Sequence, residues 1–161
     1  KPVKINKIET SEIKEMKKAL KKINIEPLEE IEVGLIVDTP ASSILIKELC
    51  EEELDFIIID ILRLTTITLN LANEYSEKYN EYHPAILKQI SNIIKTCRKA
   101  NIETSIMGKT ISSPEYVEFL VRNGIDSLIC LPNSVNETKN KIAKSEKKLI
   151  LKAVRDELHN N

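Results

Sequence analysis

Two aspartates, Asp38 and Asp60, each directly follow a short apolar run, residues 33–37 and residues 56–59. Continuous apolar runs of this length are typical of parallel strands that are covered on both faces. The carboxyl ends of such strands are where α/β folds keep their binding and catalytic sites. The sequence therefore predicts one carboxylate at each of two positions where a site would be built.

Most other titratable side chains indicate structure rather than chemistry. Asp60 is also placed to cap the segment that follows it. His83 precedes a proline at a predicted helix start, and no second His or Cys lies near it at metal-ligand spacing. His159 falls in the C-terminal tail. Three widely separated cysteines, each on an apolar face or strand, predict reduced, buried thiols in a cytoplasmic protein: Cys50, Cys97 and Cys130.

Composition narrows the function classes. The 161 residues are 42% hydrophobic, which is enough for one core and predicts one domain. The sequence has 24 Lys and Arg residues and 25 Asp and Glu residues, so its formal net charge is -1 and no basic surface for nucleic acid is expected. Aromatic residues are only 4% of the chain, so side chains that stack on bases are not expected either. No apolar run approaches the length of a membrane span, and the first residues given do not have the pattern of a signal peptide, so neither feature is expected.

The spacing of apolar residues predicts strands that alternate with helices. The predicted strands are residues 33–37, 56–59, 104–107 and 126–131, with a further short strand at residues 3–5. The predicted helices start near Thr10, at Pro40, at Arg63, at Pro84, at Pro114 and at Ser134. The third of these is expected to run to Tyr79 despite its β-branched residues 65–68, and Gly124 is expected to end the fifth.

Two helices carry specific expectations. The helix from Pro40 is expected to bury Ala41, Ile44, Leu45 and Leu49. The last helix is expected to start with a capping box between Ser134 and Glu137, and to present an apolar face made of Ile142, Leu149, Ala153 and Leu158. Lysine-rich faces at residues 14–22 and 139–148 are interpreted as solvated surfaces.

This order predicts a single α/β domain over residues 1–161, with a parallel sheet of four or five strands. A closed (β/α)₈ barrel takes about 250 residues, so the chain is either a small open sheet or a partial (half) barrel. The terminal strands of a partial barrel would present unpaired N–H and C=O groups. We expect helices and the N-terminal segment to cover these edges, or two copies of the chain to pair.

Five stretches carry a family resemblance. They read V-G-L-I-V-D-T-P-A-S-S from residue 33, D-F-I-I-I-D-I-L-R-L-T-T-I-T-L from 55, Y-H-P-A-I-L from 82, I-M-G-K-T-I-S-S-P-E from 106 and G-I-D-S-L from 124. In this order the stretches resemble the C-terminal half of the barrel of the phosphoenolpyruvate-utilising enzymes, such as phosphoenolpyruvate synthase. The resemblance is best over residues 32–136; residues 1–31 match a leading βα unit weakly, and residues 137–161 form a C-terminal helix.

The resemblance implies a phosphotransferase that moves a phosphoryl group between phosphoenolpyruvate and a histidine on a separate domain, with magnesium bound by a glutamate and an aspartate. In this sequence the glutamate position holds Asp38, and the aspartate position holds Arg63. The family's phosphate-binding arginine is replaced by Asn73, and its C-G-E proton-donor motif reads Met107-Gly108-Lys109.

These replacements predict loss of the metal and of catalysis by this chain alone. A fixed cation at the Arg63 position opposes a divalent ion, by about 4 kcal/mol per unit charge pair at 4 Å and an effective dielectric near 20. Methionine at position 107 has no acidic proton to give. We expect no magnesium at Asp38, and two interpretations of the strand ends stay open. Arg63, Lys109 and Asn73 bind phosphoenolpyruvate or another small anion, or Asp38, Arg63 and Lys109 form a salt-bridge cluster in a non-catalytic assembly domain. Expected partners are other domains of a longer protein or a second copy.

Overall fold

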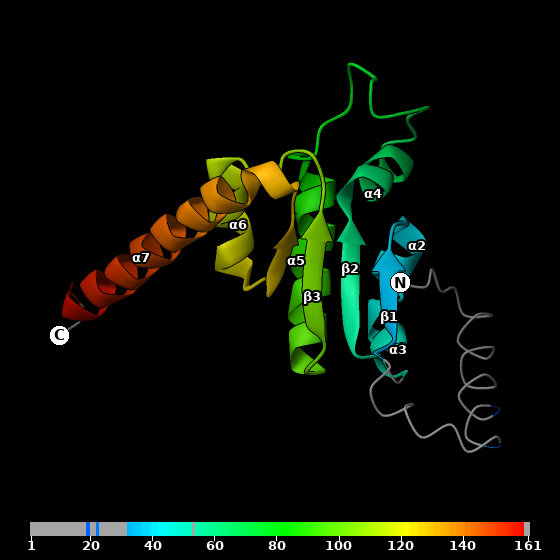
Figure 1. Cartoon of the computed structure of the whole chain (residues 1–161), viewed down its shortest axis with the longest axis horizontal. Helices are drawn as coiled ribbons and strands as arrows, with labels where there is room; N and C mark the ends of the chain where they lie inside the picture. The colour runs from blue at the N-terminus through cyan, green and yellow to red at the C-terminus, as the bar shows by residue number, and fades with distance from the viewer. Residues whose placement is uncertain (1–18, 20–21, 23–31, 53, 160–161) are drawn as a thin grey trace.

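The computed structural model describes residues 32–52 and 54–159, together with residues 19 and 22. Its centre is a four-stranded parallel sheet in the order β1-β2-β3-β4 (Figure 1). The strands are β1 (Gly34–Val37), β2 (Phe56–Asp60), β3 (Glu103–Met107) and β4 (Ser127–Ile129). This confirms the predicted α/β class, although β4 is shorter than the predicted strand at 126–131.

The two faces of the sheet differ. On one face, Leu35, Ile57 and Ile106 are fully buried beneath the helices. On the other face, Ile36 and Ile58 are only partly buried. The prediction of strands buried on both faces is therefore wrong for the described residues. A half barrel explains the difference, because its concave face is completed only by further strands.

The helices on the covered face form one core with the strands. The helix α5 (Pro84–Lys99) adds five buried side chains to this core: Ile86, Ile90, Ile93, Ile94 and Cys97. It begins as predicted, with the His83 Nδ1 accepting a hydrogen bond from the Ala85 N–H at 3.2 Å. Similarly, α6 (Pro114–Asn123) has Ser113 as its N-cap and Gly124 as its C-cap. The φ of Gly124 is 80°, a left-handed conformation that glycine adopts without steric cost. Tyr116, Val117 and Leu120 of α6 are buried, whereas Val121 is only partly buried.

The helix predicted from Pro40 is two short helices, α2 (Pro40–Ile44) and α3 (Ile46–Cys50). The chain turns at Leu45, so the face that a continuous helix would bury is broken. Ile44 is 76% exposed and Leu45 45% exposed, and Ala41 is also exposed. The buried face consists instead of Ser43, Ile46 and Leu49, of which the sequence predicted only Leu49.

The helix predicted over residues 63–79 is α4 (Ile61–Thr68), which is much shorter. Its end follows from local chemistry: the Thr66 hydroxyl donates to the carbonyls of Leu62 and Arg63, and Asn70 has a φ of 51°. Residues 69–83 form a loop that rises above the carboxyl ends of the strands (green, Figure 1).

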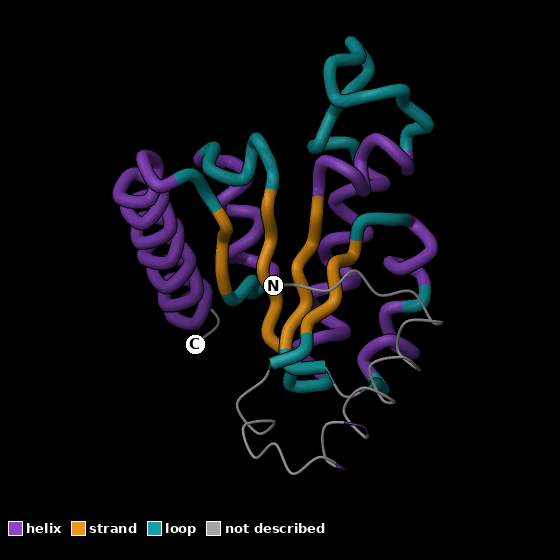
Figure 2. The backbone as a smooth tube through the Cα atoms, turned by 45° about the vertical axis from the view of Figure 1, so that its right-hand side comes forward, coloured by secondary structure: helices purple, strands orange, loops and turns teal. Residues whose placement is uncertain are grey.

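The last helix, α7 (Val135–His159), follows the short 3₁₀ turn η2 (Pro132–Ser134) and extends away from the sheet (Figure 1). Figure 2 shows it on the side of the strands opposite to α2 and α3. The predicted capping box is absent here, because the Ser134 hydroxyl donates to the Leu131 carbonyl and Glu137 pairs with Lys141. The expected apolar face is also wrong in its distal part, where Ala153 is exposed and Leu158 is 70% exposed.

The strand predicted at residues 3–5 and the helix predicted from Thr10 lie outside the described residues. In the part of the chain that is described, no helix is both long and apolar enough to cross a membrane.

Candidate functional site

The carboxyl ends of the strands bring the predicted positions to one edge of the sheet. Asp60 at the end of β2 is in register with Met107 at the end of β3. Met107 is in turn in register with Ile129 at the end of β4. Asp38 follows the last residue of β1, so it extends the same row. Because alternate residues face opposite sides of a sheet, this row lies on the partly open face.

Arg63 and Asp38 form an ion pair at this edge. The Arg63 Nε lies 3.2 Å from the Asp38 Oδ2, and the two side chains are 51% and 16% exposed. Arg63 is held in place by its own helix, since its backbone N–H donates to the Asp60 Oδ1 at 3.1 Å. Asp60 is therefore the N-cap of α4, as predicted. The guanidinium lies against the carboxylate that the family resemblance assigns to the metal.

Lys109 has partners outside the predicted trio. Its Nζ lies 3.7 Å from the Glu74 Oε1 and 4.8 Å from the centroid of the Tyr75 ring. Ion pairing at the sheet edge thus involves a second carboxylate, Glu74, which was not predicted from the sequence. Both of these partners come from the loop at residues 69–83, which brings them above β3.

Asn73 supports that loop. Its Oδ1 accepts a hydrogen bond from the Tyr75 N–H at 3.0 Å, an Asx turn that orients Glu74 and Tyr75 toward Lys109. Arg63, Lys109 and Asn73 thus lie around the same edge of the sheet on α4, on the segment after β3 and on the loop. Their binding of an anion stays a prediction.

A buried carboxylate was missed. Glu81 is only 1% exposed. Its Oε2 accepts from the Thr110 N–H at 3.1 Å and from the Thr110 hydroxyl, and its Oε1 accepts from the Tyr79 hydroxyl. Its backbone carbonyl accepts from the Tyr116 hydroxyl at 3.3 Å. Glu81 therefore fastens the loop at residues 69–83 to the segment between β3 and α6.

The surroundings of Glu81 also perturb two tyrosines. Burial, together with the hydrogen bond to Glu81, raises the pKa of Tyr79 above its ordinary value. Burial raises the pKa of Tyr116, and the nearby charge of Glu81 adds to this effect. The spacing of apolar residues around Glu81 gives no indication that this glutamate is buried. The one feature of the sequence that could have drawn attention to it is its position just before the predicted helix start at Pro84.

The donor set at the strand ends does not fit a magnesium ion. Magnesium needs hard oxygen ligands in near-octahedral geometry. Here the Asp38 carboxylate faces the Arg63 guanidinium, and Asp60 accepts from a backbone N–H of α4. Within the described ranges, no group of three or more His, Cys, Asp or Glu residues is arranged to hold a metal ion.

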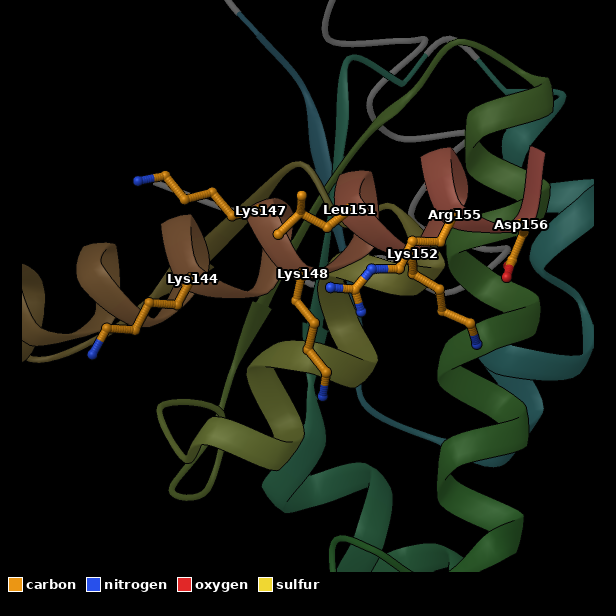
Figure 3. A pocket seen from close by; sticks show the side chains of 7 residues that line it. All are labelled: Lys144, Lys147, Lys148, Leu151, Lys152, Arg155 and Asp156. Carbon is orange, nitrogen blue, oxygen red and sulfur yellow. The ribbon is translucent and has the colours of Figure 1, made fainter. Parts of the chain in front are cut away.

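A hollow of about 490 Å³ on α7 is a poor candidate for a site (Figure 3). It is lined by five basic side chains with Leu151 and Asp156, all of them from this one helix. Figure 3 shows these side chains fanning out along the helix rather than converging. Lys148, one of the five, is already paired with Glu118 of α6 at 2.7 Å, and this pairing lowers the pKa of Glu118. The hollow agrees with the interpretation of a solvated face.

Comparison with known proteins identifies the family. A family model described as the PEP-binding domain of PEP-utilising enzymes matches residues 3–147. The chain belongs to this family. The PEP-binding domain is 37% identical to a probable phosphoenolpyruvate synthase of Methanocaldococcus jannaschii over 147 residues, which are 89% of this chain and 12% of that protein. It is also 37% identical to the phosphoenolpyruvate synthase of Pyrococcus furiosus over 141 residues, which are 86% of this chain and 17% of that protein. The domain therefore spans less than a fifth of these relatives.

Solved structures confirm the fold of the PEP-binding domain. A citrate lyase from Burkholderia xenovorans superposes with a TM-score of 0.60 at 12% identity, covering 92% of this chain and 52% of the other. The citrate lyase beta subunit of M. tuberculosis superposes with a TM-score of 0.57 at 11% identity, covering 78% of this chain and 56% of the other. Each match uses about half of the longer chain, in agreement with the predicted partial barrel.

Proposed function

We propose that this PEP-binding domain has kept the scaffold of its family and has lost the metal-dependent phosphoryl transfer. The observation that supports the proposal is the ion pair between Arg63 and Asp38 at 3.2 Å. A guanidinium cannot be deprotonated in a protein, so it stays a fixed positive charge beside the carboxylate that would ligate the ion. Met107, at the position of the family's proton donor, also has no proton to give.

A restoration experiment tests the loss. Replacing Leu62 and Arg63 by Asn and Asp rebuilds the N-D pair and replaces the guanidinium by a carboxylate. Binding of Mn²⁺, followed by electron paramagnetic resonance, should strengthen at least tenfold in this double variant, which corresponds to about 1.4 kcal/mol. Arg155→Asp on the exposed part of α7 makes the same charge change far from the sheet edge and should leave binding unchanged. Tight Mn²⁺ binding by the unmodified chain would refute the proposal.

A second candidate function is metal-independent binding of a small anion. It is favoured by the exposure of the two cations, since the side chains of Arg63 and Lys109 are 51% and 50% exposed near the carboxyl ends of the strands. An incoming carboxylate or phosphate competes there with Asp38 and Glu74, so affinity should be modest. Titration of the chain with phosphoenolpyruvate, monitored by ³¹P NMR, should give a salt-sensitive shift that Arg63→Gln and Lys109→Gln each weaken. An unchanged shift in both variants would exclude this binding mode.

We also propose that the partly open sheet face is completed by further parts of a longer protein. Support comes from the length of the relatives and from Ile129 and Leu131, which are 43% and 71% exposed at and beyond the end of β4. Light scattering of the isolated chain at increasing concentration should show self-association, because the same surface then finds no other partner. Co-expression with the adjoining part of the longer protein should abolish that self-association. A strict monomer at all concentrations would contradict this proposal.

A further inference from the structure

Two cysteines far apart in the sequence meet on the covered side of the sheet. Cys50 is the last residue of α3, and Cys97 lies near the end of α5. Their sulfur atoms are 3.8 Å apart. The two residues are 47 positions apart in sequence, so the fold and not the local chain conformation brings them together.

The two thiols differ in their access to solvent. Cys97 is fully buried within the core, whereas Cys50 is only partly buried. A groove of about 480 Å³ between α3 and α5 reaches Cys50. Its lining is mixed: Ile44, Ile46 and Ala100 contribute apolar surface, and Lys47, Glu51, Asn92, Thr96 and Lys99 contribute polar or charged groups. A molecule as small as a peroxide can therefore approach Cys50, whereas Cys97 is fully buried.

The pKa values of the two thiols are also shifted, in opposite directions. The hydrogen bond with Cys97 lowers the pKa of Cys50, more than burial raises it. The same contact and burial raise the pKa of Cys97. The contact with Cys97 thus favours the thiolate form of Cys50, which is the form in which a cysteine reacts. The C-terminal end of α3 does not favour an anion, so the effect is due to Cys97.

We propose that Cys50 and Cys97 are a redox modification site that a peroxide converts into a reversible disulfide. The Cys50 thiolate attacks one peroxide oxygen, the O–O bond breaks and hydroxide leaves, so that Cys50 becomes a sulfenic acid. The Cys97 sulfur then attacks the Cys50 sulfur, the S–O bond breaks, and the Cys97 proton leaves with the hydroxyl as water. The two cysteines lose two electrons, which reduce the peroxide, and a dithiol reductant reverses the reaction by exchange.

Closing the bond requires little movement. A disulfide has a sulfur–sulfur distance of about 2.05 Å, so the two atoms must approach by about 1.8 Å in total. The bridge would enclose β2, α4 and the loop at residues 69–83, which are the segments that hold Arg63 and Glu74. Oxidation would therefore restrain the part of the domain that shapes the strand ends.

Thiol counting tests the site. The purified chain is treated with hydrogen peroxide, denatured and alkylated with a maleimide polymer, and tryptic peptides are mapped by mass spectrometry. The reduced chain should show three reactive thiols and the oxidised chain one, Cys130, with the peptides of Cys50 and Cys97 joined. Cys130→Ser is the matched control and should still form the bridge. In Cys97→Ser, the Cys50 sulfenic acid should persist and react with dimedone.

A stability readout accompanies the chemistry. The melting temperature of the oxidised chain should rise by about 5 °C or more over the reduced chain, and a dithiol should reverse the rise. Retention of both thiols, a bridge that involves Cys130, or oxidation of Cys50 to a sulfinic acid with Cys97 still free would each overturn the proposal.

Discussion

The buried carboxylate of Glu81 gives the most specific stability prediction. Its two oxygens accept hydrogen bonds from the Thr110 amide, the Thr110 hydroxyl and the Tyr79 hydroxyl. Glu81→Ala leaves these three donors without their acceptor. An unsatisfied buried donor costs about 1–3 kcal/mol, and Thr110 and Tyr79 are only partly buried, so water will replace part of the loss. We expect a decrease of about 2–4 kcal/mol in the free energy of unfolding.

The assay is urea denaturation followed by circular dichroism. Glu81→Gln keeps one carbonyl acceptor but turns an amide donor toward existing donors, so it should cost about 1–2 kcal/mol. Glu77→Ala, an exposed glutamate in the same loop, is the matched control and should stay within about 0.5 kcal/mol of the parent chain. Hydrogen exchange at the Thr110 amide should accelerate in Glu81→Ala. A Glu81→Ala chain as stable as the Glu77→Ala control, with Thr110 still protected, would refute this account of the loop.

Three further predictions concern other parts of the domain. Because the pKa values of Tyr79 and Tyr116 are raised in the folded state, the stability that their protonation contributes should be fully present below pH about 10 and should fall as the pH rises above it. Thermal melts alongside ultraviolet titration measure this, and a melting temperature that stays constant up to pH 11 would contradict it. Gly124→Ala should cost about 1–2 kcal/mol, because its φ of 80° is left-handed and a Cβ would meet the Arg98 side chain; an unchanged melting temperature would contradict it. Leu158→Lys should change the stability of the isolated chain by less than about 0.5 kcal/mol, since this side chain is 70% exposed, and a larger loss would show that the end of α7 is packed.

The strands and several helix starts could be predicted from the sequence because local chemistry decides them. Apolar runs that end in Asp38 and Asp60 mark β1 and β2, and the prolines at positions 84 and 114 mark the starts of α5 and α6. Asp60 was also correctly predicted as a cap. In each case the signal lies within a few residues of the feature.

Features that depend on distant contacts could not be predicted in this way. The partners of Lys109 are on a loop whose path is set by Glu81, and nothing in the spacing of residues 69–83 reveals that path. The exposed apolar side chains of α7 have helical periodicity but no surface in the described part of the chain to cover them. The break at Leu45 was missed because helical spacing continues through it, although the path of the chain does not.

The proposed loss of the metal requires that Arg63, which pairs with the Asp38 carboxylate, keeps a divalent ion away from it. Isothermal titration of the chain with phosphoenolpyruvate, in the presence and absence of magnesium, is the decisive measurement. We predict the same weak heat of binding in both titrations, reduced by added salt. Binding that becomes tight only when magnesium is present would contradict this proposal and would indicate that the domain has kept the metal-dependent binding expected from the family resemblance.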